Sequence, residues 1–136
     1  MSASSVQNQS KQETRILLAE DNSGVREMVK EILSRNGYEV VATTDGRQAY
    51  DYYQAHSDRI DLVLTDIVMP EMDGKELSQL CRKMSPQVSI LFMSGYLDSQ
   101  LNPEEDLVGN ADFLAKPFRP AELLQKVEAL VEAANC

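Results

Sequence analysis

Residues 61–74 read Asp-Leu-Val-Leu-Thr-Asp-Ile-Val-Met-Pro-Glu-Met-Asp-Gly. The continuous apolar run Leu62-Val63-Leu64 is typical of a strand that is buried on both faces of a parallel sheet. Asp66 follows where that strand should end, and Pro70 and Asp73-Gly74 indicate a turn before a new helix. Ligands of open α/β sheets bind outside the carboxyl ends of the strands, so Asp66 is a candidate site residue. At this point a loop-capping Asp is an equally good interpretation.

The composition limits the kind of protein and the number of sites. A chain of 136 residues with 43% hydrophobic residues fits one globular domain, so one site is expected. The net charge of −9 argues against nucleic acid as a partner and suits a divalent cation or a basic surface better. No secretory leader or membrane-length apolar run is found, which predicts a cytoplasmic domain without membrane contact. Cys81 and Cys136 show no disulfide or metal-binding spacing and are expected to be free thiols.

Short apolar runs alternate along the chain with stretches whose apolar residues recur at helical spacing. The expected strands are Arg15–Ala19, Tyr38–Thr43, Leu62–Leu64, Val88–Met93 and Ala111–Ala115. Helices are expected after Asn22-Ser23, after Asp45-Gly46, from about Asp73, between Tyr96 and Asn110 (short and marginal), and from about Pro120. The predicted organisation is a disordered tail or linker at 1–14, a folded domain at 15–132 and a short tail at 133–136.

This alternation predicts an α/β fold with a doubly wound, five-stranded parallel sheet and five helices. Right-handed crossovers gather the carboxyl ends of all strands along one edge of such a sheet. The first polar residues after the strands should therefore converge there, namely Glu20, Asp21, Asp66, Ser94 and Lys116. This convergence favours a functional site over a loop cap for Asp66.

The residues of this cluster fit phosphoryl chemistry. Carboxylates about 4 Å apart repel each other by roughly 4 kcal/mol at an effective dielectric constant near 20, and a dication would relieve this repulsion. Mg²⁺ takes one or two carboxylates, here Asp21 and Asp66, and completes its shell with water and phosphate oxygens. Lys116 and the Ser94 hydroxyl could bind phosphoryl oxygens, while Asp66 could act as a nucleophile that forms an acyl phosphate.

The ordered set of motifs resembles the response-regulator receiver domain of two-component signalling. The resemblance covers about Arg15 to Val131 and rests on four motifs: Glu20-Asp21, Asp66 in Leu-Thr-Asp-Ile-Val-Met-Pro-Glu-Met-Asp-Gly, Met93-Ser94-Gly95, and Lys116-Pro117-Phe118. It implies a flavodoxin-like (βα)5 three-layer sandwich with a cis peptide at Lys116-Pro117. It also implies a phosphoacceptor domain that catalyses its own Asp phosphorylation, rather than a conventional enzyme.

The resemblance further implies a role for each site residue. Asp66 would take a phosphoryl group from a phosphohistidine of a sensor histidine kinase or a histidine phosphotransfer protein. Glu20, Asp21, Asp66 and the backbone carbonyl of Val68 would organise Mg²⁺, and Ser94 and Lys116 would bind the transferred group. Ser94 and Phe113 would form the switch that changes a partner-binding surface. Phe113 stands where the family often has Tyr, so it lacks the outward hydroxyl, and a simple core ring is the alternative.

Other interpretations of the same residues lead to different functions. A phosphorylation-independent interaction module with a vestigial acidic pocket is the main alternative. A phosphatase similar to the haloacid-dehalogenase type would use a second acid two residues after the nucleophile, but this chain has Val68 there. The Met93-Ser94-Gly95 and Lys116-Pro117-Phe118 motifs are similar to receivers of hybrid sensor kinases, which favours that origin slightly over a stand-alone regulator.

Overall fold

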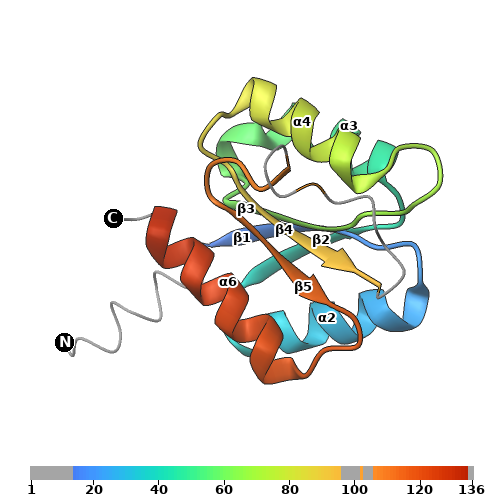
Figure 1. The fold of residues 1–136 in the computed structure, drawn as a ribbon, viewed down its shortest axis with the longest axis vertical. Helices are drawn as coiled ribbons and strands as arrows, with labels where there is room; N and C mark the ends of the chain where they lie inside the picture. The colour runs from blue at the N-terminus through green and yellow to red at the C-terminus, as the bar shows by residue number, and fades with distance from the viewer. Residues whose placement is uncertain (1–13, 96–101, 103–105, 135–136) are drawn as a thin grey trace.

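The protein folds around one five-stranded parallel sheet (Figure 1). The computed structural model describes residues 14–95, 102 and 106–134. The strands are Arg15–Ala19 (β1), Glu39–Thr43 (β2), Leu62–Asp66 (β3), Ser89–Ser94 (β4) and Ala111–Ala115 (β5). Their spatial order is β2-β1-β3-β4-β5 and every neighbouring pair is parallel, which confirms the predicted doubly wound sheet.

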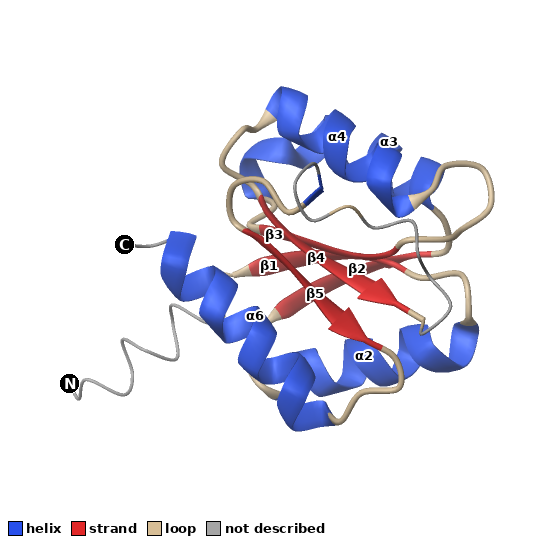
Figure 2. Cartoon of the chain, viewed as in Figure 1, coloured by secondary structure: helices blue, strands red, loops and turns tan. Residues whose placement is uncertain are grey.

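Helices cover both faces of the sheet and give the molecule three layers (Figure 2). In the described ranges they are the α-helices Ser23–Arg35 (α2), Gly46–His56 (α3), Gly74–Met84 (α4) and Pro120–Ala134 (α6), with a 3-10 helix at Ser57–Arg59 (η1). α3 and α4 lie on one face, and α2 and α6 lie on the other. The sequence predicts a fifth helix between Tyr96 and Asn110, but most of that stretch lies outside the described residues. None of the described helices is long and apolar enough to cross a membrane.

Local capping signals set where the helices begin and end. The side chains of Asn22, Asp45 and Asp73 each accept a hydrogen bond from the backbone N–H three residues further along, as N-cap residues do. α2 ends before Asn36, and Gly37 adopts a φ of 93°, the left-handed conformation that favours glycine after a helix. The three N-cap residues thus mark where the chain enters α2, α3 and α4 from the carboxyl edge of the sheet.

The core consists of two apolar layers, one on each face of the sheet. Leu17 and Val63 belong to the layer under α3 and α4, while Leu18 and Leu64 belong to the layer under α2 and α6. The three inner strands are therefore almost wholly buried, which explains the continuous apolar runs in their sequences. The edge strands β2 and β5 are only partly buried.

An ion pair joins α4 to the segment that leads into β5. Nζ of Lys75 lies 3.3 Å from Oδ2 of Asp106, whose side chain is only 1% exposed. The same carboxylate oxygen accepts a hydrogen bond from the backbone N–H of Asn102 at 2.7 Å. The pair thus ties the chain after β4 to the first turn of α4.

We expect Lys75→Met to reduce the free energy of unfolding by about 1–3 kcal/mol, because a buried carboxylate then loses its neighbouring cation. The matched control is Arg47→Met, which breaks the exposed Arg47–Asp51 pair of α3. An exposed pair of this spacing contributes about 0.3–0.5 kcal/mol. Urea unfolding followed by circular dichroism measures both losses. Equal losses in the two variants would contradict the structural role assigned to Lys75.

Candidate functional site

The strand register brings the ends of β1 and β3 together at the carboxyl edge of the sheet. Ala19 pairs with Thr65, so that Glu20 follows β1 beside Asp66, the last residue of β3. Strand order reverses between β1 and β3, since β2 lies on one side of them and β4 on the other. Such a point is where open α/β sheets bind their ligands.

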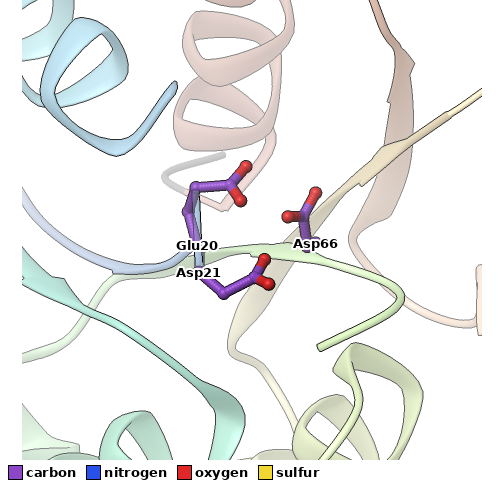
Figure 3. A group of neighbouring side chains, drawn as sticks. All are labelled: Glu20, Asp21 and Asp66. Atoms are coloured by element: carbon purple, nitrogen blue, oxygen red, sulfur yellow. The ribbon is translucent and has the colours of Figure 1, made fainter. Parts of the chain in front are cut away.

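Three carboxylates meet at this edge. Glu20, Asp21 and Asp66 each offer an oxygen, and these oxygens all lie within 4.8 Å of one another. Figure 3 shows the side chains of Glu20 and Asp21 extending from the end of β1 toward the side of Asp66. Glu20 is fully buried and Asp66 is 6% exposed, whereas Asp21 is open to solvent. The cluster is therefore a half-open acidic pocket.

Lys116 is the cation that faces these acids. Its Nζ lies 2.5 Å from Oδ1 of Asp66 and 2.9 Å from Oε1 of Glu20. The other oxygen of Glu20 accepts the backbone N–H of Asn22 at 3.0 Å. When all three carboxyl groups are ionised, their negative charges outnumber the ammonium group of Lys116, which contacts Glu20 and Asp66. The Lys116-Pro117 peptide bond is cis, as the resemblance implies.

The pKa values of the buried groups follow from this arrangement. Burial, and after it the hydrogen bond with Glu20, raises the pKa of Asp66 to about 8 against the opposing effect of Lys116. Burial also acts to raise the pKa of Glu20, but hydrogen bonds from Asp66, Asn22 and Lys116 outweigh it and lower that pKa. Burial acts to lower the pKa of Lys116, and the two carboxylates raise it overall. A proton in the pocket therefore resides on Asp66.

The loop after Asp66 is held close to the pocket. The backbone N–H of Gly74 donates to the carbonyl of Ile67 at 2.7 Å, which closes the loop into the start of α4. Glu71 adopts a φ of 69°, a left-handed conformation that is uncommon for a residue with a side chain. The side chain of Val68 is 57% exposed beside the pocket. The loop is thus anchored at both ends and turns sharply between them.

The two predicted switch residues lie at different places. Ser94 ends β4, and its carbonyl accepts the backbone N–H of Lys116 at 2.8 Å, while its hydroxyl makes no hydrogen bond to the three carboxylates. Phe113 lies in the middle of β5 with 40% of its surface exposed, and Nζ of Lys126 lies 5.8 Å from the centre of its ring. Phe113 is thus on the outer surface of the sheet and outside the pocket.

Arg26 is a residue near the pocket that sequence reasoning missed. Its Nη1 donates to the backbone carbonyl of Glu20 at 3.0 Å and lies 3.5 Å from that of Asp21. The sequence holds one signal for it, because a basic residue near the start of a helix runs against the helix dipole, which favours acids there. Such a residue needs a local partner, and here the partner is the loop that carries both acids.

The donor set of the pocket fits a hard divalent cation. Carboxylate oxygens are the ligands that Mg²⁺ and Ca²⁺ prefer in proteins, and the excess negative charge would be neutralised by such an ion. Mg²⁺ commonly uses one or two carboxylates and leaves further positions to water and phosphate. The exposure of Asp21 is consistent with a pocket that such ligands can reach from solvent.

Comparison with known proteins identifies clear relatives. The family model described as "Response regulator receiver domain" matches residues 16–128. The response regulator receiver protein CpdR of Brucella abortus is 39% identical over 120 residues, which cover 88% of this chain and 98% of CpdR. The sensor kinase CckA of Brucella abortus is 32% identical over 117 residues, 86% of this chain but only 12% of the kinase.

One solved structure with a similar fold is a complex that includes magnesium. It is the crystal structure of the CheX-CheY-BeF3-Mg²⁺ complex from Borrelia burgdorferi, and its matching chain superposes with a TM-score of 0.77 at 27% sequence identity. The match covers 86% of this chain and 88% of that chain.

Proposed function

The chain belongs to the response regulator receiver domain family, and we propose that Asp66 is the residue through which it acts as a phosphoacceptor. A receiver domain is a phosphoacceptor module of two-component signalling rather than a conventional enzyme. The observation that carries the proposal is the position of Asp66 at the carboxyl end of β3, in contact with Lys116 and beside two further acids.

The proposed reaction is a transfer from phosphohistidine to carboxylate. An oxygen of Asp66 forms a P–O bond while the P–N bond of the donor breaks, and the bonding electron pair stays with the histidine ring. As a receiver, the chain takes its phosphoryl group from a histidine kinase or a histidine phosphotransfer protein. Phosphoryl transfer depends mainly on positioning and on charge neutralisation, which the pocket supplies with few groups.

The pocket also supports a proposed metal and a set of oxygen-binding residues. Glu20, Asp21 and Asp66 would hold Mg²⁺, together with the carbonyl of Val68, and the Borrelia complex pairs magnesium with a chain of similar fold. The bound ion would neutralise charge on the carboxylates and on the incoming phosphoryl oxygens. Lys116 lies close enough to Asp66 to bind an oxygen of the transferred group.

Ser94 and Phe113 are the proposed switch residues. The Ser94 hydroxyl is free of the carboxylates and would be available to a phosphoryl oxygen on Asp66, since Asp66 pairs in register with Met93, the residue before Ser94. Phe113 would follow that movement and change the exposed surface of β5. An exposed ring can move without opening a large cavity in the core, which favours Phe113 over a buried aromatic for this role.

Intact-mass measurement after incubation with acetyl phosphate tests the proposal. We expect wild-type protein to gain one phosphoryl group only when Mg²⁺ is present. Asp66→Asn should gain none, whereas Asp51→Asn, which changes an exposed aspartate of α3, should behave as wild type. A wild-type protein that gains no mass under any condition would instead favour the docking module with a vestigial pocket. A gain that persists in Asp66→Asn would exclude Asp66 as the acceptor.

A further inference from the structure

Arg26 reaches back from α2 to the loop that carries two of the three acids. Its own backbone N–H donates to the carbonyl of Asn22 at 2.9 Å, which fixes the start of its side chain in the first turns of the helix. Helical side chains point toward the N-terminus, and here that direction leads to the end of β1. The Nη1 group contacts the carbonyls of Glu20 and Asp21 there.

Glu20 and Asp21 differ in what orients their carboxylates. The carboxylate of Glu20 is buried and held by Lys116 and by the backbone N–H of Asn22. The carboxylate of Asp21 is exposed and makes no hydrogen bond or ion pair with any described residue. The direction of the Asp21 side chain is therefore set mainly by its backbone. The carbonyls that Arg26 contacts belong to the peptide groups on either side of the Asp21 Cα.

We propose that Arg26 is a positioning residue for the metal pocket, which holds the backbone around Asp21 so that its carboxylate faces Asp66. The inference rests on the proposed function, because it assumes that Glu20, Asp21 and Asp66 bind Mg²⁺. Arg26 contacts backbone oxygens rather than the carboxylates, so it acts through the loop and leaves all ligand oxygens available to the ion.

The sign of the effect separates this role from a purely electrostatic one. Arg26 carries a positive charge close to the pocket, and by charge alone its removal would make Mg²⁺ bind more tightly. Loss of a residue that orients a ligand has the opposite effect and typically weakens metal binding by about 10–100-fold. In a variant that folds, weaker Mg²⁺ binding after removal of this cation therefore indicates lost positioning.

The test is isothermal calorimetry of Mg²⁺ binding to the full chain. Arg26→Met keeps most of the apolar stem and removes the donors, and we expect its Kd to rise about tenfold. Arg26→Lys keeps the charge and one donor group, so its Kd should lie between those of wild type and Arg26→Met. The control Arg35→Met removes the same charge from the same helix, at a pair with Glu31 whose side chains are 77% and 61% exposed. Its Kd should stay within about twofold of wild type, because screened surface charges interact weakly.

The outcomes separate failure of this inference from failure of the proposed function. Arg26→Met protein that binds Mg²⁺ as tightly as wild type, or more tightly, would overturn the positioning role while leaving the pocket intact. Wild-type protein that binds no Mg²⁺ would overturn the proposed metal site itself. Thermal unfolding without Mg²⁺ shows which variants fold. If Arg26→Met does not fold, Arg26→Gln provides the same comparison with wild type.

Discussion

Alanine at position 74 should lower the midpoint of thermal unfolding by about 10 °C. A Cβ atom on Gly74 would overlap the carbonyl oxygen of Asp66 and lie 2.9 Å from its carbonyl carbon. Both atoms belong to the backbone at the end of a buried strand, so neither can rotate away. Overpacking typically costs 1–3 kcal/mol, and we expect about 3 kcal/mol here, which is roughly 10 °C for a domain of this size.

Two further glycines make the measurement specific. Gly46→Ala should show a comparable loss, because its Cβ would overlap the carbonyl oxygen of Met72 and lie 2.8 Å from that carbonyl carbon. Gly95→Ala should have little effect, since no atom of the described residues lies within 4 Å of the position its Cβ would take. Differential scanning calorimetry compares the three variants with wild type. Gly74→Ala protein that unfolds within about two degrees of wild type would show that the loop can yield, contrary to the structure.

These contacts also show why part of the fold is hidden in the sequence. The sequence indicates a turn at Asp73-Gly74, yet Gly74 is the first residue of α4 and its φ is not positive. Glycine is required there because the helix start lies against the backbone of Asp66, on the other side of the loop. The local sequence pattern is the same whether glycine is needed for a positive φ or for lack of space. Only the packed structure shows that the requirement is one of space.

The strands and the acidic pocket were predictable for a different reason. The continuous apolar run at Leu62–Leu64 reflects burial on both faces, and the parallel topology then places the residues after each strand at one edge. That rule uses only the order of elements, so it locates Glu20 and Asp66 without any side-chain detail. The rule does not predict the contact of Arg26 with backbone carbonyls or the pairing of Lys75 with Asp106. Neither Arg26 nor Lys75 lies directly after a strand.

Asp66→Asn should make the metal-free protein more stable at neutral and mildly alkaline pH. In the wild type Asp66 is buried beside Glu20 and Asp21, and its pKa is raised to about 8. In the unfolded chain the same carboxyl ionises with a pKa of about 3.9. The folded state therefore binds an additional proton between these two pH values, so that the stabilising contribution of protonated Asp66 is fully present below about pH 4 and is lost as the pH rises through about 8.

Asparagine at position 66 does not titrate, and it can still donate a hydrogen bond toward Glu20 as the protonated carboxyl does. The gain in free energy of unfolding over wild type should therefore be smallest below about pH 4 and grow by about 1.4 kcal/mol per pH unit as the pH rises toward 8, because one pKa unit corresponds to that free energy. Urea unfolding at several pH values in chelator-treated buffer measures it, with Asp51→Asn as the exposed control. A gain that does not change with pH would exclude ionisation of Asp66 as its cause.

Added Mg²⁺ should raise the unfolding midpoint of the wild-type protein more than that of Asp66→Asn. Wild-type protein carries the uncompensated carboxylates that a dication neutralises, so millimolar Mg²⁺ should raise its unfolding midpoint, as any ligand that binds only the folded state does. Asp66→Asn has one carboxylate fewer in the pocket and less repulsion to relieve, so its midpoint should rise less. The repulsion between carboxylates that lowers the stability of the metal-free protein would therefore also favour cation binding in the pocket. Equal rises in both proteins would mean that Mg²⁺ binds elsewhere on this acidic surface.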